Sequence, residues 1–293
     1  MRKDFFWYGQ KYENNKICEG KGGGVMKRFK AQQVYLAFIM LILSIFLITG
    51  CGGHGGETDK WLGGEGTGGT GGLGPASCDG PGPVDMGAAA NFGVLAGPPL
   101  TGALTCTLPF TVNGDVAAST QSCTLTQGAG FHNYTGTDPE YVAASADMLT
   151  AIACAQARPC SAGPDFNFTS AHNFGGATLQ PGVYCVDGAM SVDSNLTFTN
   201  PGVYIFLSSG ALTTSSTVTV AFGGSANATN TSVFWVPGGA AHILGTNVFL
   251  GTIMPGNDAA ITLDANTTLI PGRVLSNSAV TLGGGGLSEI TIP

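Results

Sequence analysis

Five short segments in the C-terminal half of the chain repeat one pattern: a small residue, an alanine, an apolar residue and, usually, a serine or threonine. The segments are 188–191, 210–213, 240–243, 259–262 and 278–281, and their alanines recur every 19–30 residues. Turn dipeptides such as Pro201-Gly202 and Pro255-Gly256 separate them. A repeat of about 20 residues built from short strands is typical of a β-solenoid, in which successive coils stack.

Each coil contains three candidate strands, which predicts a right-handed parallel β-helix of triangular section. An up-and-down barrel or a sandwich is the alternative, but it would have longer strands and no turn recurring at one interval. Because side chains alternate between the two sides of a strand, the apolar residues of the repeat are expected to point inward. The predicted core rows are Met190, Leu212, Ile261 and Val280, with Val192, Leu244, Leu263 and Leu282.

The same alternation places the alanine and the hydroxyl residue of each segment on the outside. The predicted ladder is Ala189, Ala211, Ala241, Ala260 and Ala279 beside Ser191, Thr213, Ile243, Thr262 and Thr281, with Ser278 at its edge. His242 is then expected to point inward. A flat surface of methyl and hydroxyl groups without charges is the candidate functional face. The Thr217/Thr219 and Asn247/Thr267 rows are the next candidate.

The N-terminal part has the composition of an export signal followed by a tether. Residues 1–25 are interpreted as a misannotated leader, and 26–50 as a lipoprotein signal peptide with a basic start and an apolar run. Residues 51–83 are a Gly-rich tether, and 84–293 form the folded domain. The sequence Ile48-Thr49-Gly50-Cys51 resembles a bacterial lipobox, which predicts lipidation at Cys51. An uncleaved transmembrane anchor is the alternative; both place the domain outside the cytoplasm, and the lipobox places it on the bacterial cell envelope, at the outer membrane or cell surface.

Six further cysteines suit disulfides in an exported domain: Cys78, Cys106, Cys123, Cys154, Cys160 and Cys185. Proximity in sequence favours the pairs Cys154–Cys160 and Cys106–Cys123, which leaves Cys78–Cys185. A metal site is the alternative, but no CxxC pair or nearby histidine supports one, so neither metal nor cofactor is expected.

The charge distribution limits the partners. The net charge is −7, and only Arg158 and Arg273 are basic beyond Lys60, so a nucleic-acid partner is excluded. One helix is predicted over 137–157, with an apolar stripe formed by Tyr141, Ala144, Met148, Ile152 and Ala155.

The chain resembles the microbial ice-binding protein family, whose members have an irregular β-solenoid with one long helix alongside. The segments that carry the resemblance are 84–96, 112–116, the helix, 179–184, 202–206, 233–236 and 279–282. The resemblance implies coils that are not stacked strictly in sequence order, and one flat face that adsorbs to ice.

The function expected from these residues is therefore ice adsorption by a monomer held to a membrane through its lipid, which inhibits ice growth or recrystallisation or holds the cell against ice. An enzyme is not expected, because the acidic residues are scattered and the folded part lacks lysine. The alternative is a cell-surface adhesin or glycan-binding solenoid, which would need exposed aromatic residues. Phe234 and Trp235 lie in the middle of a strand, however, and one of them is expected to be in the core.

Overall fold

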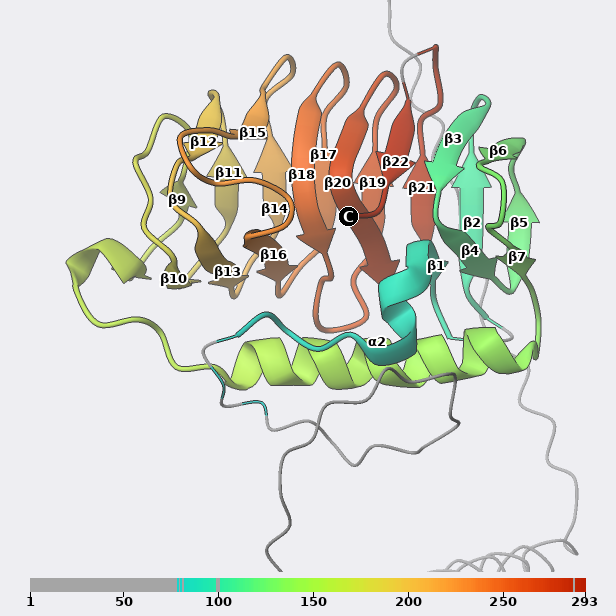
Figure 1. Ribbon diagram of the computed structural model, residues 1–293, viewed down its shortest axis with the longest axis horizontal. Helices are drawn as coiled ribbons and strands as arrows, with labels where there is room; N and C mark the ends of the chain where they lie inside the picture. Colours follow the sequence, from blue (N-terminus) through green and yellow to red (C-terminus); the bar gives the residue numbers. More distant parts are fainter. Residues whose placement is uncertain (1–77, 79, 81, 99–100, 287) are drawn as a thin grey trace, which may run out of the picture. The chain divides into compact units, whose positions relative to one another are not determined.

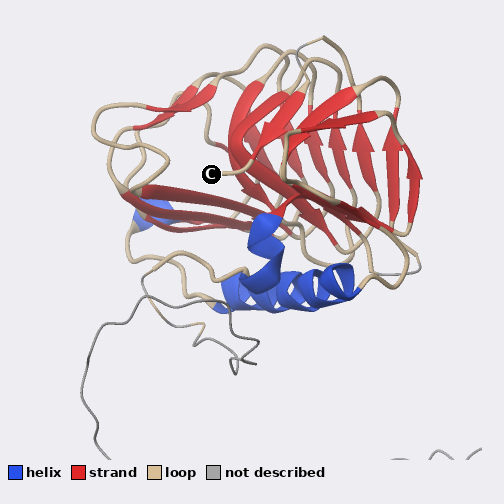
Figure 2. Cartoon of the chain, turned by 45° about the vertical axis from the view of Figure 1, so that its right-hand side comes forward, coloured by secondary structure: helices blue, strands red, loops and turns tan. Residues whose placement is uncertain are grey.

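The computed structural model describes residues 78, 80, 82–98, 101–286 and 288–293. These residues form a mainly β solenoid whose strands pair in parallel and cover three sides (Figure 2). The predicted solenoid architecture is therefore confirmed. The predicted leader, signal peptide, lipidation site at Cys51 and most of the tether lie outside the described residues. Among those that are described, no helix is long and apolar enough to cross a membrane.

One side is an eight-stranded parallel sheet, here called the ladder face. In spatial order its strands are β5 (Thr120–Ser122), β2 (Ala103–Cys106), β21 (Val280–Leu282), β19 (Ile261–Leu263), β17 (Ala241–Ile243), β14 (Leu212–Thr214), β11 (Met190–Val192) and β9 (His172–Asn173). Every strand is short, so each coil contributes only one or two outward side chains to this side.

The second side, the helix-covered face, contains the strands that precede the ladder strands in each coil. They are β8 (Asn167–Phe168), β10 (Gly182–Val186), β13 (Gly202–Ser208), β16 (Thr231–Pro237), the ends of β18 (Val248–Ile253) and β20 (Thr268–Ser276), and β1 (Phe92–Ala96), β4 (Asp115–Ala118) and β7 (Asn133–Tyr134).

The third face contains the strands that follow the ladder strands. They are β12 (Leu196–Phe198), β15 (Val220–Phe222), the beginnings of β18 and β20, then β22 (Glu289–Thr291), β3 (Phe110–Asn113) and β6 (Leu125–Gln127). Strands β18 and β20 join two sides, because their pairing shifts register between Phe249 and Gly251. Strands β3 and β4 follow each other closely and are separated only by Gly114.

The coils are not stacked in sequence order. The N-terminal strands pair with the last C-terminal coil, Val94 with Val274 and Leu104 with Val280. Figure 1 shows this arrangement, with β1 to β7 beside β21 and β22 at one end of the solenoid. Residues 92–134 therefore extend the stack formed by 167–293, as the family resemblance implies.

Helix α2 (Pro139–Ala157) runs along the helix-covered face beneath most of the stacked coils (Figure 1). It begins two residues later than predicted, and the predicted stripe of Tyr141, Ala144, Met148, Ile152 and Ala155 is buried against the sheet. The hydroxyl of Tyr141 donates to the carbonyl oxygen of Ala96 at 2.7 Å. Two short 3-10 helices, η1 (Gly87–Asn91) and η2 (Pro164–Phe166), flank the solenoid.

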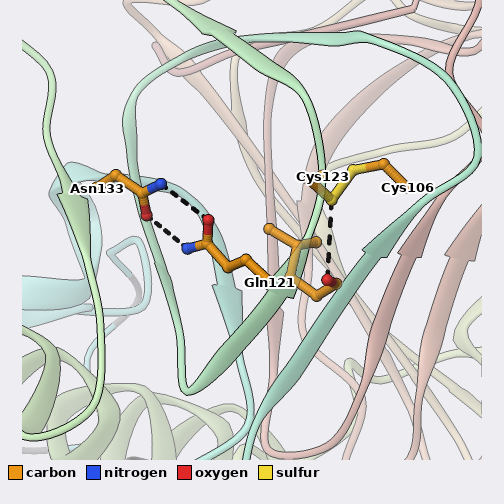
Figure 3. Close-up of a disulfide and its surroundings, with 5 residues drawn as sticks. Cys106, Gln121, Cys123 and Asn133 are labelled. Carbon is orange, nitrogen blue, oxygen red and sulfur yellow. Dashed lines mark hydrogen bonds between the residues drawn. A yellow bond between two sulfur atoms is a disulfide. The ribbon is translucent and has the colours of Figure 1, made fainter.

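The six cysteines form three disulfides, of which one was predicted correctly. Cys106–Cys123 joins β2 to the segment after β5 at the end of the stack formed by the N-terminal strands. The side chains of Gln121 and Asn133 are hydrogen-bonded to each other nearby (Figure 3). The other two predicted pairs are wrong, because the bonds are Cys78–Cys154 and Cys160–Cys185. Cys78 is bonded to the C-terminal half of α2, and Cys160 to β10. Proximity in sequence fails here because the helix runs back along the whole stack.

Candidate functional site

Two columns of small side chains run across the outside of the ladder face. One column consists of one outward residue from each ladder strand, and the pairing register aligns its members directly. In spatial order they are Asn173, Ser191, Thr213, His242, Thr262, Thr281, Thr105 and Ser122. The other column lies two residues earlier in each coil, and it consists of Ala171, Ala189, Ala211, Ala240, Ala260, Ala279, Ala103 and, at the end, Thr120.

Backbone hydrogen bonds fix the alanine column. The N–H of each core residue donates to the carbonyl oxygen of the alanine in the next coil. The bonds are Met190 to Ala211 at 2.8 Å, Leu212 to Ala240 at 3.0 Å, Ala241 to Ala260 at 3.1 Å, and Ile261 to Ala279 at 3.1 Å. Since each coil is tied to its neighbour at the same point, the outward methyl groups form a regular array with strands about 4.8 Å apart.

The register of the third segment differs from the prediction by one residue. Ala241 pairs with Ile261 and is buried, and Ile243 is also buried. His242 points outward between Thr213 and Thr262, and Ala240 takes the outward position predicted for Ala241. Leu244, predicted as a core residue, is half-buried, whereas the other seven predicted core residues are buried.

The remaining predicted ladder residues lie where the sequence pattern places them, except Ser278. Its backbone N–H bonds the Ser276 hydroxyl at 2.9 Å, and it lies in the bend before β21, outside both columns. Thr213 and Ala189 are exposed, while Ser191, Ala211, Thr262, Ala260, Ala279 and Thr281 are half-buried by their neighbours in the array.

The N-terminal coils add residues that the sequence prediction missed. Ala103 and Thr105 on β2 continue the two columns beyond Ala279 and Thr281. A signal for them exists, because residues 102–105 have the same four-residue sequence, Gly-Ala-Leu-Thr, as residues 210–213. Their early place in the chain conceals that they stack on the last coil.

The glycine that begins several of these segments is required by the close approach of successive coils. A Cβ atom on Gly210 would lie 2.7 Å from the backbone nitrogen of Ala189, and one on Gly102 would lie 1.7 Å from the carbonyl oxygen of Ala96. Neither position tolerates a side chain. The glycines therefore keep the coils tightly stacked at the entrance to the ladder face.

One ionisable side chain interrupts the columns within the described strands. The Nε2 atom of His242 lies 2.9 Å from an Asp264 carboxylate oxygen, and the two side chains are 44% and 38% exposed. Asp264 lies just after β19, at the edge of the face next to the third face. Asp193 lies at the same edge, where its carboxylate accepts a hydrogen bond from the Ser191 hydroxyl at 3.2 Å.

The other two sides of the solenoid are less suited to contact with a flat surface. The helix-covered face is buried beneath α2. On the third face Glu289 lies between Thr268 and Thr111, and it accepts a hydrogen bond from Asn113 at 2.7 Å. Of the second candidate rows, Asn247 and Thr267 are wrong as surface residues, because both are buried at the corner next to the ladder face.

The aromatic residues considered for glycan binding do not lie on the ladder face. Phe234 and Trp235 are buried, so neither can stack on a glycan. In the described part of the chain, no group of three His, Cys, Asp or Glu side chains lies close enough together to hold a metal ion. What the ladder face offers is an ordered array of methyl, hydroxyl and amide groups.

The fold and this face together define a class, a parallel β-solenoid with one helix alongside and one almost uncharged side of mostly small side chains. The chain belongs to the ice-binding-like family, whose model matches residues 69–287. It is 28% identical over 223 residues to an ice-binding protein of Flavobacterium frigoris, a match that covers 72% of this chain and 76% of the relative.

Solved structures agree with this assignment. The crystal structure of an ice-binding protein from the Antarctic ascomycete Antarctomyces psychrotrophicus has 27% identity and a TM-score of 0.59. It covers 72% of this chain, and this chain covers 98% of it. An ice-binding protein from an Antarctic bacterium of the Flavobacteriaceae has 28% identity and a TM-score of 0.58, with 71% of this chain and 47% of that one covered.

Proposed function

We propose that this protein adsorbs to ice through its ladder face and thereby inhibits ice growth or recrystallisation. The observation that carries the proposal is the pair of columns, one of alanines and one mainly of threonines and serines. The relatives named as ice-binding proteins, and the family to which the chain belongs, support the same function.

The physical basis is a rigid array that ordered water can match. Outward side chains are spaced about 4.8 Å apart between coils and about 6.6–7 Å apart along a strand. Threonine presents a methyl and a hydroxyl group on a stiff rotamer, and alanine presents a methyl group with no rotamer freedom. Each contact with ice is weak, so adsorption requires many of them on a surface that loses little entropy on binding.

The core and the disulfides supply that rigidity. Buried Leu212, Ile261 and Val280 lie directly behind the two columns, and the Cys106–Cys123 bond closes the coil at one end of the face. A bound array of this kind pins the ice front, which must curve between adsorbed molecules, and further growth is slowed.

The test is substitution within the threonine column. In the purified protein, the pair of changes Thr262→Tyr and Thr281→Tyr places two rings across the middle of the face. We expect thermal hysteresis and recrystallisation inhibition to fall to the level of buffer, with unchanged circular dichroism. The matched control is Thr219→Tyr with Thr126→Tyr, because these exposed threonines lie on the third face. Loss of activity only in the control pair would move the site to the third face.

Further aspects of the proposal concern where the protein acts. Three disulfides are consistent with an extracytoplasmic protein. We propose that lipidation of Cys51 anchors it to the bacterial cell envelope, so that adsorption can also hold the cell against ice. The protein would act as a monomer and without catalysis. Mass spectrometry of the mature N-terminus tests the anchor, with a diacylated or triacylated Cys51 as the expected result.

A further inference from the structure

The two basic residues beyond Lys60, Arg158 and Arg273, have different surroundings. Arg158, at the end of α2, donates from Nη1 to the Gly82 carbonyl oxygen at 2.6 Å and from Nη2 to the Pro83 carbonyl oxygen at 3.3 Å. Both of its terminal nitrogens are therefore bonded to backbone carbonyls, whereas its Nε atom is buried without a partner. The segment that precedes η1 is held against the helix by these bonds.

Arg273 is more deeply buried as a whole residue, and one of its three guanidinium nitrogens forms a hydrogen bond. It lies on β20, on the outer side of the helix-covered face next to Thr252, and only 8% of its surface is exposed. Its Nε atom donates to the Ala90 carbonyl oxygen at 2.9 Å. Within the described residues, its Nη atoms have no hydrogen-bond partner and no carboxylate forms an ion pair with it.

Arg273 lines a pocket of about 220 Å³. The pocket lies between the segment before η1, the beginning of β16 and the bend of β20. Most of its walls are apolar, with hydroxyl groups near the arginine. The apolar walls include Val84, Met86, Phe222 and Phe234, and Ser232 and Thr252 lie beside them. Pro293 also lines the pocket, and within the described residues it forms no ion pair with Arg273.

A cation in such a place is costly unless an anion accompanies it. Desolvation by burial lowers the pKa of Arg273 to about 10. A buried charge without a partner destabilises a protein, whereas a hydrogen-bonded counter-charge offsets much of that cost. A ligand that supplies the counter-charge would offset part of the desolvation cost of Arg273, and this offset would contribute to its binding free energy.

We propose that this pocket binds a small organic carboxylate with a short apolar tail. Because Nε is bonded to Ala90, the carboxylate would be held end-on by Nη1 and Nη2, a fork that matches two carboxylate oxygens. The tail would lie against Val84, Met86 and Phe234. A phosphate or sulfate dianion suits the pocket less well, because one arginine would leave the second charge uncompensated among apolar walls. The volume limits the ligand to a few carbon atoms.

The proposed site is separate from the ladder face, since no residue that lines the pocket belongs to a ladder strand. The two proposals can therefore fail independently. Ice activity depends on the ladder face, and carboxylate binding depends on the pocket, so each measurement tests one of the two proposals.

The experiment is a titration of the purified protein with sodium butyrate, sodium acetate, sodium chloride and sodium sulfate at equal ionic strength. Thermal unfolding and calorimetry are the two measurements. We expect butyrate to raise Tm with the logarithm of its concentration, by about 5–10 °C at 100 times its Kd. Acetate should bind more weakly, because it has less apolar surface.

Two variants locate the response. Arg273→Met should remove the butyrate response, while Arg158→Met, the matched control, should keep it at a lower starting Tm. If Arg273→Met does not fold, Arg273→Lys replaces it, since it keeps the charge, loses the fork and should weaken butyrate at least tenfold. The proposal is overturned if butyrate acts no differently from chloride, if sulfate binds more tightly in calorimetry, or if either Arg273 variant responds like the wild type.

Discussion

The single histidine in the threonine column predicts a gain of function. Replacing His242 with threonine would create an uninterrupted row of five threonines, from Thr213 through positions 242, 262 and 281 to Thr105, because the pairing register places these positions side by side. The imidazole is longer than its neighbours and is hydrogen-bonded to Asp264 at 2.9 Å, so it places a partly exposed polar pair in the array.

The expected size of the gain follows from one added methyl contact. Burying a group of that size contributes about 0.8 kcal/mol, which is about a fourfold change in an equilibrium constant. The protein concentration that gives half-maximal recrystallisation inhibition should therefore fall about fourfold, and thermal hysteresis at fixed concentration should rise. The His242–Asp264 pair is partly exposed, so its loss should change the free energy of unfolding by less than about 1 kcal/mol.

The matched control is His132→Thr. His132 also lies near an aspartate, with Nδ1 3.8 Å from an Asp115 oxygen, but it lies outside the ladder face and its side chain is 68% exposed. The control should leave ice activity unchanged. If His242→Thr folds normally and its activity is equal to or lower than that of the wild type, the reasoning that the column binds ice through its methyl and hydroxyl array is refuted.

Three further predictions concern stability. Ile261→Ala removes a fully buried side chain behind the face and should cost about 2–5 kcal/mol, measured by urea unfolding; a cost below about 1 kcal/mol would contradict the assigned core. Replacing Cys106 and Cys123 with alanine should cost about 3 kcal/mol for a loop of this length, whereas an unchanged Tm would show that the bond does not stabilise the terminal coil. Burial raises the pKa of Tyr141 and Tyr184 to about 12, above the unfolded value near 10, so stability should be full below pH 10 and decline as pH rises toward 12. Chemical unfolding between pH 9 and 12 checks this, and a flat profile would argue against it.

The repeat of turns and short strands was sufficient to predict the solenoid, because its period and alternation are local properties of the sequence. The same holds for the apolar stripe of the helix. The register of one coil was not predictable in this way, since the pair Ala240-Ala241 allows two alignments one residue apart. One alignment would place His242 in the core, which is unfavourable because a polar ring would be buried. The other alignment places Ile243 in the core, and Ile243 is buried.

What the sequence could not supply was the order of the coils in space. Thr105 lies more than 170 residues before Thr281, yet the two are paired neighbours. The disulfides Cys78–Cys154 and Cys160–Cys185 depend on the same fact, because helix α2 returns along the stack before the C-terminal coils begin. Contacts between distant segments set these features, and a local pattern carries no information about them.

The core behind the ladder face varies in side-chain size from coil to coil. Behind the middle of the face Ala241 replaces the larger Leu212 and Ile261 of the adjacent coils. In the same coil the helix-covered face contributes Trp235, which stacks on Phe206 with ring centroids 4.2 Å apart and donates from Nε1 to the Leu250 carbonyl oxygen at 2.9 Å. Ala241 and Trp235 belong to one buried cluster, so a small and a large side chain contribute to the core of the same coil. Because protein interiors are close-packed, we infer that the large ring offsets the small volume of the alanine and helps to keep β17 in line with its neighbours.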